Sequence, residues 1–518
     1  MKRSRSACLN RYVRQGDRLK SAPVSRLRSY LIMAMWVLTS ARPSLAEAIK
    51  LHPDNPHYFL FRGRPTVLIT SGEHYGAVLN RDFDYITYLN ELQSKGLNLT
   101  RTFSGGPYRE IPASFNIAKN TLAPAPNRFS CVWAESSTPG YAAGGNKFDL
   151  KVWNEAHLAR LKDFVAQAGK RGIVVEMNLF TPYYNEELWN VSPLKETNNV
   201  NAIGNVASVE ALTLKNPALL AVEDAMVRKI VTELNDFDNV YYEVCNEPYF
   251  GGVTQEWQDH ITSTIVETEA LLSSRHLISH NIANGSTKIV NPKSAVSIFN
   301  FHYSRPPESV GLNYGLKTVI GLNETGFDGP ADVTYRIQGW EFILAGGGLY
   351  NNLDYSFTVD HPDGTFVPPE STPGGGSPAL RSQLKILKEF IHGFNFVKMA
   401  PNDVVIKGGL PSGAMARALV EAGKAYAIYI HHGTPGYSHN ASPPQSARSP
   451  YAVQTGKQQL TLRLDIPRGG YRAEWVNTKT GHIDKAENFN HPGGNKTLVS
   501  PTYSEDIALR DRQATPAN

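Results

Sequence analysis

The pattern of hydrophobic and polar residues changes near residue 397. Between residues 65 and 396, short apolar runs alternate with segments in which apolar residues recur every three or four positions. The runs, rich in β-branched and aromatic residues, are typical of buried strands, and the intervening segments of amphipathic helices. After residue 397, period-two segments separated by Gly, Pro and Asn turns predict antiparallel strands.

The apolar runs predict eight parallel strands. Because strands alternate with helices, the fold class is α/β, and eight such units imply a closed (β/α)8 TIM barrel. The connections after the fifth and sixth strands are short and rich in Pro, Gly, Asn and Ser, so their helices should be single turns. The predicted strands span residues 65–70, 97–102, 173–179, 239–245, 277–283, 296–301, 318–322 and 348–357.

The last part of the chain predicts a small accessory domain. Its strands, at residues 425–431, 459–466, 471–477 and 507–510, suggest a β-sandwich. We therefore divide the chain into a leader (1–46), a barrel (47–396) and a C-terminal β-sandwich (397–518). His431 and His432 are expected on the surface of the sandwich.

A buried run that stops abruptly marks the first candidate catalytic residue. Residues 240–245 have strand composition and are followed by Asn246-Glu247-Pro248. Proline cannot donate to a strand ladder, so Asn246 and Glu247 should lie at the carboxyl-terminal tip of this strand. That tip is the functional face of a barrel, and a carboxyl group there is suited to protonating the leaving oxygen of a sugar. An isolated Asn-Glu-Pro would instead cap a turn.

Glu324 is the second candidate, at the end of the predicted seventh strand. Alone, it would be a solvated loop acid. Two carboxyl groups about 5 Å apart permit glycosidic hydrolysis with retention, one as acid/base and the other as nucleophile. A separation of about 6.5 to 9.5 Å would instead permit inversion through a bound water. Beyond about 10 Å neither mechanism is available.

The Asn246-Glu247-Pro248 motif resembles that of the retaining glycoside hydrolases of clan A, the cellulase-like (β/α)8 group. In that group the glutamate of this motif is the general acid/base, and the nucleophile ends strand seven. The resemblance therefore assigns these roles to Glu247 and Glu324. It extends over residues 49–396 and specifies neither the sugar nor the linkage. Residues 471–481 resemble a C-terminal module that family nomenclature calls a collagen-binding domain, although nothing in the sequence shows collagen binding.

The resemblance also implies residues around the carboxyl pair. Arg101 matches the clan's arginine beside the nucleophile, and Asn246 matches the asparagine that binds the sugar 2-hydroxyl. The clan has His-x-Tyr after the sixth strand, whereas His302 and Tyr303 are adjacent here. Regular alternation would send adjacent side chains to opposite faces. We expect both in the site, although a regular strand would let only one reach the sugar.

Other groups are expected near the same end of the barrel. Glu73 and His74 follow the first strand and are candidate sugar-binding groups, as are Asp354 and Tyr355 near the end of the eighth. Glu243 shares the face of Glu247 and should be buried in the barrel beside a cation. The long loops at residues 104–150 and 181–215 could wall a substrate cleft. Their aromatic residues include Tyr108, Trp133, Tyr141, Tyr183, Tyr184 and Trp189.

The formal charge of +5 originates at the amino terminus. Residues 1–46 hold ten Lys/Arg and one acid, which leaves −4 on the remainder. A basic stretch, the apolar run 31–38 and the small-x-small sequence Ser44-Leu45-Ala46 have the layout of a secretory signal peptide. We expect cleavage after Ala46 and a secreted or periplasmic protein. An uncleaved anchor and a start codon downstream of Met1 are alternatives. The acidic body predicts neither a nucleic-acid partner nor a membrane segment in the mature chain.

Cysteines and motifs narrow the chemistry further. Cys131 and Cys245 remain after the leader, and a bond between them stays open. No Cys/His spacing suggests zinc, and the chain has no GxSxG, HExxH or GxxxxGK[ST] motif. We predict a secreted glycoside hydrolase with a carbohydrate substrate, a retaining mechanism and no metal or organic cofactor. The alternative is a carbohydrate-binding or adhesive protein with a catalytically silent barrel.

Overall fold

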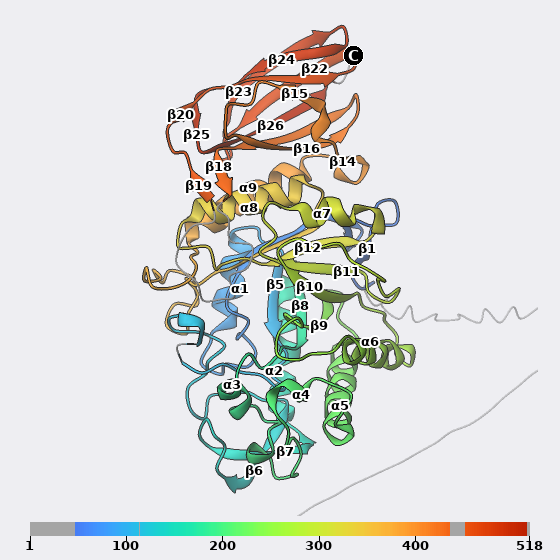
Figure 1. Ribbon diagram of the computed structural model, residues 1–518, viewed down its shortest axis with the longest axis vertical. Coiled ribbons are helices and arrows are strands. Elements are labelled where there is room, and N and C mark those ends of the chain that lie inside the picture. The colour runs from blue at the N-terminus through green and yellow to red at the C-terminus, as the bar shows by residue number, and fades with distance from the viewer. Residues whose placement is uncertain (1–46, 113, 436–450, 515–518) are drawn as a thin grey trace, which may run out of the picture. The chain divides into compact units, whose positions relative to one another are not determined.

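The structure, a computed structural model, describes residues 47–112, 114–435 and 451–514, and the predicted leader lies outside them. Its centre is a parallel eight-stranded sheet in the order β4-β13-β12-β11-β10-β9-β8-β5. Figure 1 labels β5 and β8 to β12 of this sheet and the helices around them. This order confirms the predicted (β/α)8 architecture. The strands are β4 (Leu68–Gly72), β5 (Leu99–Phe103), β8 (Val174–Phe180), β9 (Val240–Cys245), β10 (Ile278–Asn284), β11 (Ile298–His302), β12 (Val319–Glu324) and β13 (Leu349–Leu353).

A side chain joins the two end strands, β4 and β5, at their amino-terminal ends. The Asn98 Oδ1 accepts from the Ile69 N–H at 2.9 Å, and the Asn98 Nδ2 donates to the Val67 carbonyl at 3.0 Å. The amide of Asn98 thus pairs the backbone groups that a neighbouring strand would otherwise satisfy.

The amino-terminal end of the barrel is closed by apolar residues. Ile49, Phe59 and Phe61 form one buried cluster with the residues that begin most barrel strands. They belong to or border a small antiparallel sheet of β1 (Lys50–Leu51), β2 (Phe59–Phe61) and β3 (Arg64–Thr66). The opposite end is therefore the one open to substrate, as in barrels generally.

Amphipathic helices surround the sheet, and their ends follow local sequence signals. The Asp84 side chain accepts from two backbone N–H groups at the start of α1, and Pro217 occupies the first turn of α5. The reduced outer layer was predicted correctly: residues 285–297, all described, contain no helix, and α7 is short. The helices are α1 (Tyr85–Ser94), α2 (Glu155–Lys170), α5 (Pro217–Leu234), α6 (Gln255–Ala270), α7 (Glu308–Asn313), α8 (Asp332–Leu344) and α9 (Pro378–His392).

Two long segments follow β5 and β8, at the open end of the barrel. They carry η1 (Ser114–Asn116), an antiparallel hairpin of β6 (Trp133–Pro139) and β7 (Asn146–Trp153), then α3 (Glu186–Asn190), η2 (Glu196–Asn198) and α4 (Ser208–Ala211). Short 3-10 turns also occur at η3 (Tyr314–Leu316), η4 (Phe396–Lys398) and η5 (Asp403–Val405).

Antiparallel sheets make up the C-terminal region, as predicted. A six-stranded sheet, β14-β16-β17-β26-β22-β23, and a three-stranded sheet, β15-β21-β24, contribute side chains to one apolar cluster. The strands are β14 (Ala400–Pro401), β15 (Ile406–Gly408), β16 (Met415–Glu421), β17 (Ala425–His431), β18 (Gly433–Pro435), β19 (Tyr451–Val453), β20 (Lys457–Gln458), β21 (Thr461–Ile466), β22 (Gly469–Val476), β23 (Ile483–His491), β24 (Gly494–Val499), β25 (Tyr503–Ser504) and β26 (Asp506–Gln513).

His431 and His432 correct one expectation about this region. Both are fully buried rather than exposed on a surface. The His431 Nε2 lies 3.3 Å from Glu341 Oε1 of α8, so His431 belongs to the contact between the sheets and the barrel. Among the residues that the structure describes, no helix combines the length and apolar character that a membrane span requires.

Candidate active site

Two buried carboxylates face each other at the open end of the barrel. Glu247 follows β9 and Glu324 ends β12, and the two residues are only 5% and 6% exposed. One oxygen of each lies within 4.8 Å of the other. His302 lies between them, with Nδ1 3.0 Å from Glu247 Oε1 and 3.4 Å from Glu324 Oε1. The structure therefore brings together the two glutamates that the strand count selected.

Unusual backbone conformations position the side chains around this pair. Glu247 has φ of +38° and Tyr303 has φ of +50°, a left-handed region that non-glycine residues rarely occupy. The pairing of β11 with β12 also shifts register between Phe301 and His302. Because regular alternation is lost there, both His302 and Tyr303 reach the carboxylates.

Three donors converge on Glu324. The Tyr303 hydroxyl donates to Oε1 at 2.6 Å, and the Tyr75 hydroxyl donates to Oε2 at 2.8 Å. The Arg101 Nη1 also donates to Oε2, at 3.2 Å. Two hydroxyls and a cation thus hold this carboxylate in one orientation and partly offset its negative charge.

Arg101 lies beneath the pair and connects it to a polar layer inside the barrel. Its guanidinium donates to Glu176, to Glu243 and to the Asn246 Oδ1, the last at 2.8 Å. Burial and the charge of Glu243 hold the pKa of Glu176 well above its ordinary value. Burial raises the pKa of Glu243, but the Arg101 charge and the hydrogen bonds of Glu176 and Asn300 together lower the pKa below its ordinary value. Glu243 is thus buried beside a cation, as predicted.

Glu247 receives its own set of hydrogen bonds. The Tyr184 hydroxyl donates to Oε2 at 2.7 Å and accepts from the Asn246 Nδ2 at 2.9 Å. The Tyr249 hydroxyl donates to Oε1 at 3.3 Å. Burial raises the pKa of Glu247, whereas the hydrogen bond and charge of His302 and the Tyr184 hydroxyl lower it, and the net pKa lies below the ordinary value.

Sequence reasoning assigned no role at the carboxylates to Tyr75, Tyr184 or Tyr249. Tyr75 directly follows the two polar residues chosen after the first strand, and its φ of +54° turns it toward Glu324. Tyr249 lies two residues after Glu247, beyond a proline where no regular periodicity applies. For Tyr75 and Tyr249, the sequence signal that could have identified them was their position beside a candidate motif. Tyr184 had no such signal, because it was one of several aromatic residues in a long loop.

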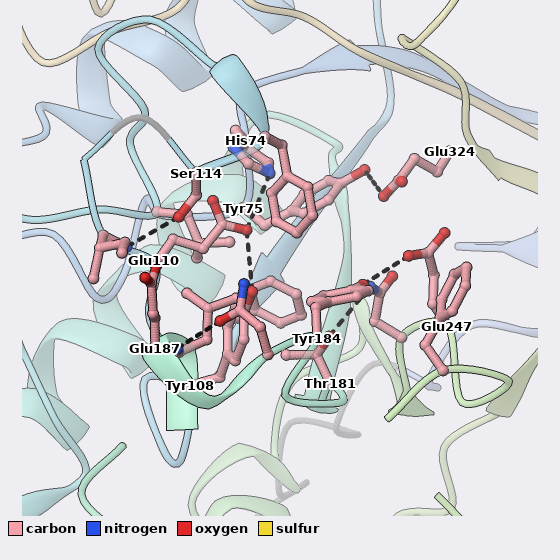
Figure 2. A pocket seen from close by; sticks show the side chains of 18 of the residues that line it. His74, Tyr75, Tyr108, Glu110, Ser114, Thr181, Tyr184, Glu187, Glu247 and Glu324 are labelled. Carbon is pink, nitrogen blue, oxygen red and sulfur yellow. Dashed lines mark hydrogen bonds and ion pairs between the residues drawn. The ribbon is translucent and has the colours of Figure 1, made fainter. Parts of the chain in front are cut away.

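A cavity of about 610 Å³ opens in front of the carboxylates (Figure 2). Aromatic rings dominate its wall, and none of the described residues that line it is Lys or Arg. The lining consists of His74, Tyr75, Phe103, Tyr108, Glu110, Ile111, Pro112, Ser114, Phe115, Asn116, Leu122, Thr181, Tyr184, Asn185, Glu187, Leu188, Asn246, Glu247, Phe250, Tyr303, Glu324 and Phe327. A concave, aromatic site with a few convergent polar groups suits a small organic ligand.

Several predicted site residues do not reach this cavity. The Glu73 carboxylate is buried and accepts from the Gly76 and Ala77 N–H groups and the Thr121 hydroxyl. We expected Glu73 to bind sugar, but these contacts give it a structural role. Arg101 and His302 contact the two carboxylates from below instead of lining the cavity. His74 does line it, as do Asn246 and Tyr303.

Other candidates from the loops and strand ends also lie elsewhere. Tyr108 and Tyr184 line the cavity, whereas the Tyr141 hydroxyl donates to the Val191 carbonyl and Trp133 is buried outside the lining. Asp354 pairs with Arg381 at 2.7 Å instead of facing substrate. Tyr355 is likewise buried outside the lining. Cys131 and Cys245 are free and buried, so they form no disulfide bond.

Glu247, His302 and Glu324 are also the described residues whose ligand atoms lie close enough together to hold a metal ion. Their surroundings fit a metal poorly. Arg101 already supplies positive charge to Glu324, and tyrosine hydroxyls occupy oxygens of both carboxylates. This donor set stabilises negative charge by cations and hydrogen bonds, so we assign the three residues no metal.

Comparisons with known proteins agree with this arrangement. Residues 127–273, which include Glu247, match the model of the cellulase family, glycosyl hydrolase family 5. No curated protein matches the sequence. A Bacteroides vulgatus protein described as a candidate glycoside hydrolase has a similar structure, with TM-score 0.59 and 14% identity over 90% of this chain and 83% of its own. A family 5 glycoside hydrolase from the same species gives TM-score 0.57 and 14% identity over 90% and 94%.

The structural likeness shows the fold, and the family match adds the chemistry. The chain is a glycoside hydrolase on a (β/α)8 barrel, and its substrate is a carbohydrate.

Proposed function

We propose that this protein cleaves O-glycosidic bonds of a poly- or oligosaccharide by a retaining double displacement, with Glu324 as nucleophile and Glu247 as acid/base. The observation that carries the proposal is the distance between the two carboxylates, with one oxygen of each within 4.8 Å. Retaining enzymes place the two groups about 5 to 5.5 Å apart, whereas inverting enzymes need about 6.5 to 9.5 Å. A spacing this short supports the retaining mechanism over the inverting one.

In the first step the Glu324 carboxylate attacks the anomeric carbon, and Glu247 gives its proton to the leaving oxygen. In the second step Glu247 takes a proton from a water molecule, which attacks the glycosyl ester and releases Glu324. Asn246 holds the sugar 2-hydroxyl, and its Oδ1 is fixed by Arg101 at 2.8 Å.

Tyr75, Tyr303 and Arg101 each donate to Glu324, so they orient its carboxylate for attack and stabilise the negative charge that returns to it when the ester carbon–oxygen bond breaks. Glu247 must hold a proton before the first step, yet the hydrogen bond and charge of His302 lower its pKa. Sugar binding removes water from the cavity, and this desolvation favours the neutral acid.

The test uses Glu324→Gly and Glu247→Ala with activated aryl β-glycosides and azide. We expect Glu324→Gly to lose hydrolysis and to form an α-glycosyl azide. The kcat/KM of Glu247→Ala should fall about 10²- to 10⁴-fold on substrates with poor leaving groups, and this variant should form a β-glycosyl azide. Glu187→Ala removes an exposed carboxylate of the same cavity and is the matched control, which should give no azide product.

Inverted products, or azide products of the opposite anomeric form, would contradict the roles assigned here. A wild-type protein that cleaves no glycoside in a broad panel while still binding glycan would favour the catalytically silent alternative.

We further propose that the protein is exported, with a leader cleaved after Ala46, because residues 1–46 have the layout of a signal peptide. The C-terminal sheets are proposed to form a β-sandwich, since strands of two sheets share one apolar cluster. The proposed role of this β-sandwich is to cover the side of the barrel formed by α8.

A further inference from the structure

A second polar pair lies in the cavity wall and takes no part in the proposed bond cleavage. His74 follows β4 and Glu110 lies in the long segment after β5, and both line the cavity although they are only 8% and 3% exposed. The His74 Nε2 lies 3.9 Å from the Glu110 Oε1. In Figure 2 dashed lines connect Glu110 to His74 and to Tyr108.

The hydrogen bonds of Asn120 fix the protonation of His74. The Leu122 N–H donates to Asn120 Oδ1 at 2.8 Å, and Asn120 Nδ2 donates to Glu110. The amide oxygen therefore faces His74, and His74 Nδ1, 2.7 Å away, must be the donor. Burial lowers the pKa of His74 to about 4, so the ring is neutral and its Nε2 presents a bare lone pair to the cavity.

Glu110 is the complementary group. The Tyr108 hydroxyl donates to its Oε1 at 3.2 Å, and Asn120 donates to its Oε2. Burial raises the pKa of Glu110 to about 8, so at neutral pH the carboxyl group holds a proton and can donate. An acceptor at His74 and a donor at Glu110, 3.9 Å apart, are too distant to bond directly. A hydroxyl group between them can accept from one and donate to the other.

The charges around the cavity act against an acidic sugar. Glu187, Glu247 and Glu324 line the wall, and the described lining includes no Lys or Arg. A uronate or sulfated sugar would therefore bring its negative charge into a desolvated site without a cationic partner.

We propose that His74 and Glu110 form a subsite for one hydroxyl group of an uncharged sugar, and that the cavity rejects sugars bearing an acid group. The His74 ring lies 5.5 Å from the Tyr75 ring, whose hydroxyl donates to Glu324, so we assign the bound hydroxyl to the sugar unit whose bond is cleaved. The inference rests on the proposed function, because it assigns the substrate of that same site.

The test begins with p-nitrophenyl β-D-glucoside, -mannoside, -galactoside, -xyloside and -glucuronide. Monodeoxy analogues of the best neutral substrate are then compared in the wild type, Glu110→Ala and His74→Ala. We expect removal of one particular hydroxyl to lower the wild-type kcat/KM on the order of 10- to 100-fold, because it leaves buried groups unpaired. In either variant, removal of the same hydroxyl should lower kcat/KM by less than about threefold, since the side chain that would bind this hydroxyl is already absent. Glu267→Ala, which removes an exposed carboxylate of α6 outside the cavity lining, is the control and should keep the wild-type discrimination.

Equal discrimination of every analogue by the wild type and folded variants would overturn the subsite, as would preference for the glucuronide. If neither variant folds, a crystal structure of Glu247→Gln soaked with the best substrate tests the subsite instead. A sugar oxygen within hydrogen-bond distance of both His74 Nε2 and Glu110 supports the subsite, and a bound sugar with no oxygen there refutes it. Absence of any cleavage by the wild type contradicts the proposed function instead, and soaks with glucose and glucuronate then test the subsite separately.

Discussion

At the scale of single residues, the site depends on backbone conformations that side-chain pattern does not encode. Three residues of the site have positive φ: Glu247, Tyr303 and Tyr75. Glu247 is one of the two carboxylates, and both tyrosines donate to the other, Glu324. Left-handed backbone in bulky residues costs about 1 to 3 kcal/mol each and persists where the surroundings over-determine it. Here hydrogen bonds from three strand ends supply that constraint, so strain and function coincide.

His302 is expected to set the working pH of the enzyme through Glu247. Its hydrogen bond and charge lower the pKa of Glu247, so His302→Asn should raise that pKa. The general acid must be protonated, and kcat/KM falls as pH rises through its pKa. We therefore expect the alkaline limb of the kcat/KM profile of His302→Asn to move to higher pH.

The control for this profile is His260→Asn, a surface histidine paired with Asp224, whose profile should match the wild type. An alkaline limb of His302→Asn that stays in place or moves to lower pH would show that His302 does not depress the pKa of Glu247.

At the scale of elements, the loops after β5 and β8 decide the shape of the cavity. Residues 108–112, 114–116 and 184–188 supply much of its lining, whereas the β6–β7 hairpin packs elsewhere. The segment after β5 is rich in aromatic and turn residues throughout. Composition therefore could not distinguish its cavity-lining residues from those of the β6–β7 hairpin. The barrel strands, in contrast, follow directly from their apolar runs.

Asn98 is expected to contribute strongly to stability as the link between β4 and β5. Asn98→Ala would leave the Ile69 N–H and the Val67 carbonyl without their side-chain partner in a buried position. We expect a loss of about 2 to 4 kcal/mol in the free energy of unfolding, measured by urea denaturation. Asn90→Ala, an exposed position on α1, should change it by less than about 0.5 kcal/mol. A similarly small change for Asn98→Ala would contradict the closing role.

At the scale of the whole molecule, α8 is a shared element of the barrel and the C-terminal sheets. Every residue from Thr334 to Leu344 is buried, which is the property of a helix covered on all sides. The rings of Trp340 and Tyr429 stack with centroids 5.2 Å apart, and Arg336 pairs with Asp506 at 2.9 Å. The C-terminal sheets thus cover the outer face of α8.

Removing Arg336 should destabilise the protein, because Asp506 would remain buried without its cation. We expect Arg336→Ala to lose about 3 to 5 kcal/mol by urea denaturation at neutral pH. Arg228→Ala, which breaks an exposed pair with Asp224, should lose less than about 1 kcal/mol.

The loss on removing Arg336 should also depend on pH. Burial raises the pKa of Asp506, but the charge and hydrogen bond of Arg336, together with the Tyr429 hydroxyl, hold that pKa below the ordinary value. The pair therefore stabilises the fold above the unfolded-state pKa and loses this contribution as pH falls through the folded-state pKa. The difference between Arg336→Ala and wild type should shrink in acid, and a difference independent of pH would contradict this account.

The sequence by itself determined the strands, their order in the chain and the two glutamates at strand ends. Those features depend on local signals: apolar runs, a proline after Glu247, and the count of units that brings Glu324 opposite it. Only the tertiary structure decided that His302 and Tyr303 both reach the site, that Glu73 is structural and that Glu110 enters the cavity. These outcomes depend on left-handed backbone, loop paths and long-range packing, which no periodicity records.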